Sequence, residues 1–76
     1  MNISGVVVKA YPEKIISIEE VLTTMEGVEV HGNNEDGRIV VTVEQESANK
    51  VSDILVEIQQ VPGVLSAAMV YHHFDD

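Results

Sequence analysis

The chain has 76 residues, enough for one domain with a single two-layer core and too few for a deep cleft between domains. Thirteen acidic and four basic residues give a formal net charge of −9, so the surface repels nucleic-acid and membrane phosphates and would attract a cationic peptide. The sequence contains no cysteine, which excludes disulfides and thiolate metal sites, and no apolar run approaches the ~20 residues that span a membrane. We therefore expect one cytoplasmic domain over residues 1–76 that neither binds nucleic acid nor inserts into a membrane.

The first half of the chain predicts a strand, a helix and a second strand. Residues 3–10 are rich in β-branched side chains and predict a strand, which Pro12 ends because proline lacks the N–H that a sheet requires. A helix over about residues 13–25 should follow, since apolar side chains recur there at the spacing of one helical face: Ile15, Ile18, Leu22 and Met25. Gly27 ends this helix, and the alternating residues 28–32 predict a short strand.

The second half of the chain repeats this order of elements. Residues 32–37 are dense in turn-forming side chains and predict a hairpin loop, after which residues 38–45 alternate as a strand. Ser47 is a typical helix N-cap, and the apolar spacing beyond it predicts a helix over about residues 47–60. The last strand, at about residues 64–72, is unusual because its side chains are small or apolar with almost no polar alternation. Its second face must therefore be covered, or kept apolar for another purpose.

An internal repeat indicates how these elements are arranged. When the two halves of the chain are superimposed, Ile18 corresponds to Ile54 and Gly27 corresponds to Gly63. Two βαβ halves with right-handed crossovers combine into one antiparallel sheet of strand order 4-1-3-2, with both helices on one face. This arrangement is the ferredoxin-like βαββαβ sandwich of the α+β class, and it leaves the opposite face of the sheet uncovered.

The strand patterns predict which side chains line that open face. The third strand should direct alternate side chains towards the helices, and the repeat extends this to the first strand: Ile39, Val41, Val43, Ile3, Gly5 and Val7. In the last strand a strict repeat would turn Val64 and Ser66 inward. We instead expect its bulkier residues inward, after a slip or bulge beyond Gly63: Leu65, Ala67, Met69 and Tyr71. The candidate binding residues on the open face are then Val6, Val8, Ala10, Val40, Thr42, Ser66, Ala68, Val70 and His72. At its rim, Glu29 and Glu44 could hold a cation.

The sequence carries no residue pattern for catalysis or for metal binding. It lacks a glycine-rich phosphate loop, a zinc signature and a nucleophile elbow. His31, His72 and His73 with Asp75 and Asp76 could be imagined as a metal cluster, but adjacent strand residues point to opposite faces and would not share one ion. We expect no catalytic residue, no metal and no cofactor. The apolar open face is instead typical of an interaction surface, covered by a peptide or by a second copy of the chain.

Several segments of the chain resemble the NapD family: residues 4–8, Gly37 with residues 39–44, residues 62–65, and residues 70–72. The resemblance covers nearly the whole chain. It implies the ferredoxin-like fold and a cytoplasmic chaperone that binds the twin-arginine signal peptide of the periplasmic nitrate reductase catalytic subunit precursor. Such proteins delay export until the molybdenum cofactor has been inserted, and they hold neither a cofactor nor a catalytic residue themselves. The expectation is a monomeric signal-peptide chaperone without enzymatic activity, with the open sheet face as its binding site.

The sequence leaves one main alternative open. Many ferredoxin-like domains are regulatory modules that dimerise and bind a small molecule, and dimerisation would also cover an apolar sheet face. Because one fold hosts many functions, the topology alone does not decide between a dimeric regulatory module and a peptide-binding chaperone.

Overall fold

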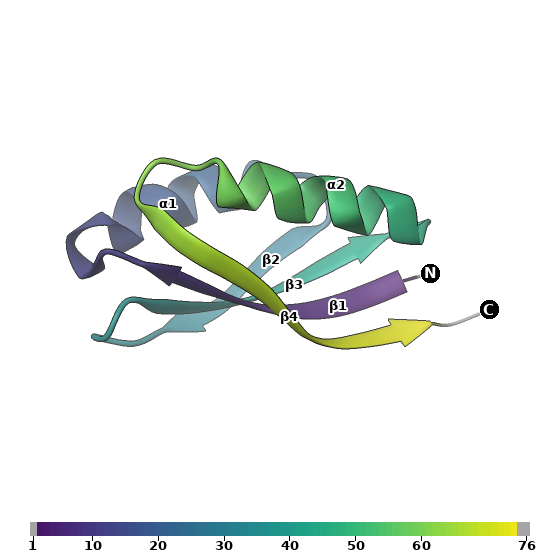
Figure 1. The fold of residues 1–76 in the computed structure, drawn as a ribbon, viewed down its shortest axis with the longest axis horizontal. Coiled ribbons are helices and arrows are strands. Elements are labelled where there is room, and N and C mark those ends of the chain that lie inside the picture. Colours follow the sequence, from purple (N-terminus) through teal and green to yellow (C-terminus); the bar gives the residue numbers. More distant parts are fainter. Residues whose placement is uncertain (1, 75–76) are drawn as a thin grey trace.

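Two α-helices lie on one face of a four-stranded antiparallel sheet, in which the strands follow the order β2-β3-β1-β4 (Figure 1). The computed structural model describes residues 2–74. Its elements, in chain order, are β1 (Asn2–Ala10), a 3-10 turn (Pro12–Lys14), α1 (Ile15–Leu22), β2 (Val28–Asn33), β3 (Arg38–Gln45), α2 (Ala48–Gln59) and β4 (Val64–Phe74). The strand order is the predicted 4-1-3-2 counted from the other edge, so the predicted ferredoxin-like α+β fold is confirmed.

The core fills the space between the helices and the sheet and is largely aliphatic. β3 contributes Ile39, Val41 and Val43, which are fully buried as predicted. The helices add apolar residues at the expected spacing, namely Ile15, Ile18, Leu22, Val51 and Ile58. Ser47 caps α2 as predicted, because its hydroxyl accepts a hydrogen bond from the backbone N–H of Lys50 at 3.3 Å.

The first helix is shorter than the predicted 13–25. It opens with the 3-10 turn that begins at Pro12, and its α-helical part ends at Leu22. The hydroxyls of Thr23 and Thr24 each donate a hydrogen bond to the carbonyl three residues earlier, at 2.9 and 2.6 Å. In a longer helix these carbonyl oxygens would accept hydrogen bonds from backbone N–H groups of the next turn. The threonine hydroxyls compete for them, and this competition favours the end of the helix at Leu22.

β1 presents the opposite face from the one predicted. Val6 and Val8 are fully buried beneath the helices and Ala10 is 4% exposed, so the prediction that these side chains lie on the open face is wrong. Directly paired residues of an antiparallel sheet point to the same side, and β1 pairs Val6 with Val41 and Val8 with Ile39 of the core. The repeat holds for the helices but slips by one residue in β1, and a one-residue slip turns every side chain to the other face. The residues that face away from the helices are therefore Ile3, Gly5 and Val7.

β4 contains two bulges, which set the direction of its side chains. Its register against β1 shifts at Leu65 and again at Val70, neither of which has a direct partner. Val64 and Ala67 both pack against the core. The inward direction of Val64 is the one that a strict repeat requires, and the inward direction of Ala67 is the one that we predicted. The bulge expected after Gly63 is therefore present, but it follows Val64 rather than preceding it.

The large side chains of β4 do not enter the core. The predicted inward direction is wrong for Leu65 and Tyr71, which are 58 and 53% exposed. Met69 pairs with Val6 and points to the helix side as predicted, but it is still 41% exposed. Leu65 occupies the first bulge, Met69 lies on the edge strand of the sheet, and the second bulge turns Tyr71 away from the helices. A strand with two bulges cannot be assigned from a single alternating pattern.

His72 also points the other way from the prediction. It pairs directly with Ser4, which is fully buried on the helix side of the sheet. The Ser4 hydroxyl and the His72 Nδ1 lie 2.5 Å apart and form a hydrogen bond. His72 is therefore excluded from the open face, because the second bulge reverses the alternation before it.

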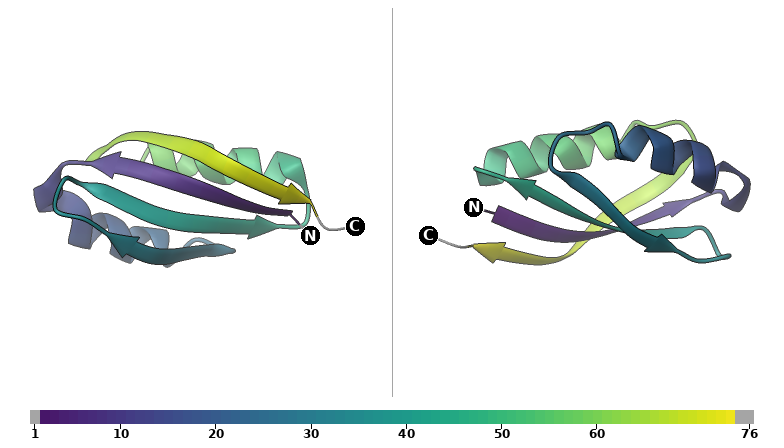
Figure 2. Two further views of the ribbon diagram at one scale, coloured as in Figure 1. Left: turned by 90° about the horizontal axis from the view of Figure 1, so that it is seen from below. Right: turned by 180° about the vertical axis from the view of Figure 1, so that it is seen from behind.

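The open face of the sheet is visible when the molecule is turned so that the helices lie behind (Figure 2, left). Within residues 2–74, no helix or loop crosses this face. The prediction of a two-layer domain with one uncovered sheet face is therefore confirmed for the described part of the chain.

Gly37 occupies a position in which a larger residue would be strained. Its φ of 93° lies in the left-handed region, and a Cβ at this site would press on the backbone carbonyl oxygen of Ala10. The Gly37 carbonyl accepts a hydrogen bond from the Ala10 N–H at 2.8 Å, which joins the β2–β3 hairpin to the end of β1. We expect Gly37→Ala to lower the free energy of unfolding by about 2 kcal/mol, measured by urea denaturation.

The matched control is Gly32→Ala in the same hairpin. Gly32 has no positive φ, and nothing lies within 4 Å of the place where its Cβ would stand. This variant should change the free energy of unfolding by less than about 0.5 kcal/mol. Equal losses in the two variants would contradict the role assigned to the Gly37–Ala10 contact.

Candidate functional site

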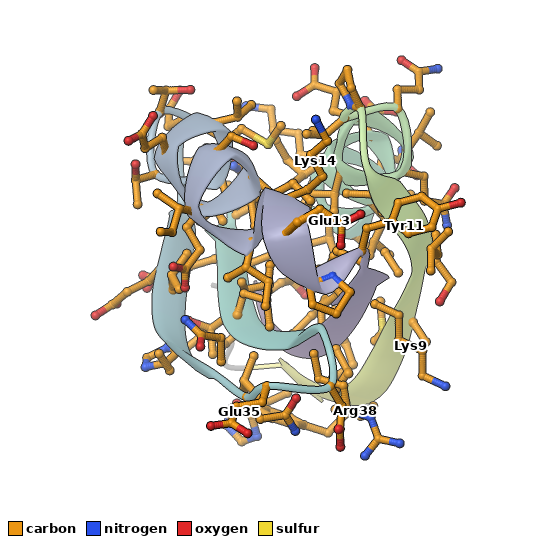
Figure 3. All side chains as sticks on the ribbon, turned by 90° about the vertical axis from the view of Figure 1, so that its left-hand side faces the viewer. Lys9, Tyr11, Glu13, Lys14, Glu35 and Arg38 are labelled. Carbon is orange, nitrogen blue, oxygen red and sulfur yellow. The ribbon has the colours of Figure 1, made fainter. Side chains whose placement is uncertain are left out.

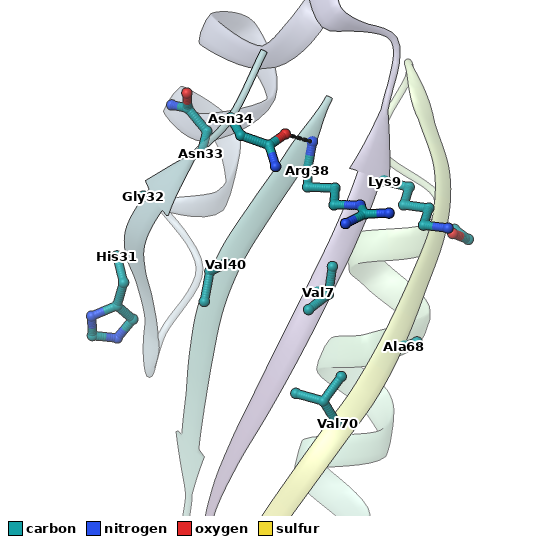
Figure 4. Close-up of a pocket in the computed structure, with 11 residues that line it drawn as sticks. Val7, Lys9, His31, Gly32, Asn33, Asn34, Arg38, Val40, Ala68 and Val70 are labelled. Carbon is teal, nitrogen blue, oxygen red and sulfur yellow. Dashed lines mark hydrogen bonds between the residues drawn. The ribbon is translucent and has the colours of Figure 1, made fainter. Parts of the chain in front are cut away.

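A groove of about 830 Å³ crosses the open face of the sheet (Figure 4). Its size lies within the range of pockets that bind ligands in proteins. All four strands and the β2–β3 hairpin contribute to its lining: Val7, Lys9, His31, Gly32, Asn33, Asn34, Arg38, Val40, Ser66, Ala68 and Val70.

The middle of this groove is apolar. Val7 of β1 pairs with Val40 of β3 on one side and with Ala68 of β4 on the other, so the three side chains form a row across the sheet. The bulge in β4 adds Val70, which is 61% exposed, while Val40 is 47% exposed. We call this surface, formed by Val7, Val40, Ala68 and Val70, the apolar floor. The small side chains of Ala68 and Ser66 leave room for a guest backbone to approach closely.

One end of the groove is cationic. Lys9 of β1 and Arg38 of β3 are directly paired, and both side chains are exposed on the open face. Arg38 follows the hairpin, whose Asn34 Oδ1 accepts hydrogen bonds from the backbone N–H groups of Asp36 (3.1 Å) and Arg38 (3.2 Å; Figure 4). The hairpin turn thus fixes the start of β3 and with it the position of Arg38.

The opposite end of the open face is acidic. Glu29 of β2 pairs directly with Thr42 of β3, and Glu44 follows two residues later on the same side of β3. Diagonal neighbours of this kind lie roughly 7–8 Å apart, close enough to share one cationic guest. His31 Nε2 and Thr42 Oγ1 form a hydrogen bond of 2.8 Å between the acidic end and the apolar floor.

Tyr71 extends the open face beyond the groove. It pairs with Gly5, and its aromatic ring lies where a side chain at Gly5 would project. Glycine at this position lets the ring lie flat on the sheet, so the open face continues as an apolar surface from Val70 to the acidic end.

The described part of the chain offers no metal site. Within residues 2–74 no group of three His, Cys, Asp or Glu side chains is placed to hold a metal ion. Asp75 and Asp76, which the sequence offered as further ligands, lie outside the described residues. None of the helices in this range is long and apolar enough to cross a membrane.

The structure brings together part of the predicted site. Val40, Ser66, Ala68 and Val70 line the groove, and Thr42 lies beside it on the same face. The other predicted residues lie on the helix side of the sheet: Val6, Val8, Ala10 and His72. That any of these residues contacts a peptide stays a prediction.

Sequence reasoning missed the contribution of β1 to the groove, namely Val7 and Lys9. The sequence did contain a signal for this contribution. Val7 and Lys9 are two residues apart in a strand and share one face, so a strand that points Val7 inward would also bury Lys9 in an aliphatic core. A lysine is almost never buried without a partner. Arg38 and Asn34 were also missed, since their place beside Lys9 depends on the strand register.

Fold and site together define a ferredoxin-like binding domain, with an apolar groove between two oppositely charged ends of an open sheet. The family model described as NapD protein matches residues 1–76. The chain therefore belongs to the NapD family, and the resemblance seen in its sequence is confirmed.

Individual relatives and a solved structure agree with this family. The protein named Chaperone NapD of Escherichia coli (strain K12) is 29% identical over 76 residues, which cover 99% of this chain and 87% of that protein. Chaperone NapD of Haemophilus influenzae is 24% identical over 99% of this chain and 82% of its own length. The solution structure of the E. coli Tat proofreading chaperone protein NapD superimposes with a TM-score of 0.86 at 29% identity, covering 97% of this chain and 79% of that one.

Proposed function

We propose that this chain is a chaperone that binds the twin-arginine signal peptide of the periplasmic nitrate reductase catalytic subunit precursor on its open sheet face. Binding would delay export until the molybdenum cofactor has been inserted into the precursor. The chaperone works as a cytoplasmic monomer and has no catalytic role. The single observation that carries the proposal is the open sheet face, on which the apolar floor of the groove is followed by two carboxylates beyond the groove, Glu29 and Glu44.

Such a surface is complementary to a pair of arginines followed by an apolar segment. Burying about 400 Å² of apolar area would contribute roughly 10 kcal/mol at about 25 cal/mol per Å². Association itself costs about 4–15 kcal/mol, so the apolar floor alone gives marginal binding. Contacts between arginines and carboxylates supply the specificity, and the net charge of −9 speeds the encounter.

The face of the sheet is better suited to a peptide than its edges. An added strand would need a regular row of unpaired backbone groups, and both edge strands are interrupted by bulges. β4 is bulged at Leu65 and Val70, and the register of β2 shifts at His31. An apolar helix laid on the apolar floor satisfies its own backbone hydrogen bonds and needs no free edge. We therefore propose that the peptide binds as a helix.

Calorimetric titration with the signal peptide tests this function. One peptide should bind per protein molecule, and a variant peptide with two lysines in place of the arginines should bind roughly 10-fold more weakly. The planar guanidinium group forms bidentate contacts with carboxylates that an ammonium group cannot form. Absence of binding, or a protein that sediments as a tight dimer with its open face covered, would contradict the proposal.

A further inference from the structure

The pairing of Lys9 with Arg38 is unexpected in so acidic a protein. These are two of only four basic residues in the sequence, and the sheet places them directly opposite each other on one face. Like charges in this position destabilise a sheet. Within residues 2–74 neither side chain forms a hydrogen bond or an ion pair, although the chain has thirteen acidic residues. Figure 3 shows both side chains extending away from the helices, whereas Lys14, in the 3-10 turn, lies on the helix side of the molecule.

The open face therefore carries opposite charges at its two ends. Lys9 and Arg38 stand at one end of the apolar floor, and Glu29 and Glu44 stand at the other. From Arg38 to Glu44, β3 covers about 20 Å at about 3.4 Å per residue. A helix of about 13 residues, at about 1.5 Å per residue, has the same length.

A helical peptide with arginines at its start has the complementary direction. Its N-terminal end carries the arginine charges and the positive end of the helix dipole, while its last carbonyls carry a partial negative charge. Placed along β1 in the direction of that strand, the peptide sets its arginines at Glu29 and Glu44 and its last carbonyls at Lys9 and Arg38. The reverse placement would set arginines against two cations and carbonyls against two carboxylates.

We infer that the groove binds its peptide in one orientation, parallel to β1, and that Lys9 and Arg38 fix this orientation by binding the C-terminal end of the peptide helix. The inference rests on the proposed function and extends it. It assigns the cationic pair a role in recognition, and it predicts that a helix of about 13 residues spans the open face from Glu44 to Arg38.

Spin labels on the peptide test the orientation directly. The protein contains no cysteine, so a nitroxide can be attached to a single cysteine in the synthetic signal peptide alone. A label after the apolar segment should broaden the amide signals of Lys9 and Arg38, and a label before the arginines should broaden those of Glu29 and Thr42. The reversed pattern, or equal broadening from both labels, would overturn the orientation while leaving the proposed function intact. Broadening confined to α1 and α2, or no binding, would overturn both.

A pair of neutral variants gives a second, independent test. Lys9→Gln with Arg38→Gln makes the protein more acidic, so a general attraction between an acidic protein and a cationic peptide would tighten binding. The proposed orientation predicts the opposite, a loss of roughly 3- to 5-fold, because the peptide helix loses its partners at the carbonyl end. Lys14→Gln with Lys50→Gln, on the 3-10 turn and α2, changes the net charge equally and should not weaken binding. If both double variants bind more tightly than the unaltered protein, Lys9 and Arg38 do not contact the peptide.

Discussion

Val40→Asp is expected to weaken binding of the twin-arginine signal peptide by about 100-fold, because it places an unpaired carboxylate under the apolar segment of the guest. Val40 is 47% exposed and pairs with Val7 in the middle of the apolar floor. The carboxylate is hydrated in the free protein and loses that hydration in the complex, at a cost of about 2–3 kcal/mol. Calorimetry measures the change, and an unaltered pattern of amide signals would show that the fold is retained.

Val56→Asp is the matched control for this experiment. Val56 lies on α2 and is 51% exposed, so the substitution adds the same charge to an equally accessible valine on the other side of the molecule. It should leave the affinity within about 2-fold of the unaltered protein. If the two variants bind equally well, or if Val56→Asp is the one that loses the peptide, the open face is not the binding surface.

Val6→Asp is expected to unfold the protein at room temperature, whereas Val7→Asp should leave it folded. Val6 is fully buried between the sheet and the helices, so its replacement strands a carboxylate in an aliphatic core. Such a group costs several kcal/mol. Domains are stable by only about 5–15 kcal/mol, and one of this size belongs near the lower limit.

Circular dichroism with thermal unfolding compares these neighbouring positions. Val7→Asp projects into the groove and should lower the melting temperature by only a few degrees while abolishing peptide binding. The opposite result, a folded Val6→Asp and an unfolded Val7→Asp, would mean that β1 has the direction first predicted from the repeat.

The topology could be predicted because it depends on local patterns. The helical spacing of Ile15, Ile18 and Leu22, the turn residues around Gly37 and the repeat of Gly27 at Gly63 each mark an element or its end. With right-handed crossovers, these elements combine in few ways. The core face of β3 was correct for the same reason, since its apolar residues alternate strictly.

The faces of the two remaining strands could not be predicted in this way. β1 is apolar at consecutive positions, and its direction is set by its register against β3. β4 turns at two bulges whose positions depend on its pairing with β1, including the fit of Tyr71 over Gly5. Both depend on contacts between strands distant in the sequence.

The cationic end of the groove also depends on contacts between distant strands. Lys9 and Arg38 are far apart in the chain, and only the hairpin and the β1–β3 register make them neighbours. The acidic end was anticipated, because Glu29 and Glu44 alternate with core residues of their own strands. The sequence thus predicted an acidic, apolar surface, and the structure adds the cationic end that gives it a direction.

The central claim is that the signal peptide binds to the open sheet face. The most direct test is nuclear magnetic resonance of the valine methyl groups after the protein has been titrated with the peptide. In the complex, nuclear Overhauser contacts should connect the peptide with the methyls of Val7, Val40 and Val70, which line the groove. None should reach Val21 or Val56, which are exposed on the helices. Contacts with the helix valines and not with those of the groove would contradict the account.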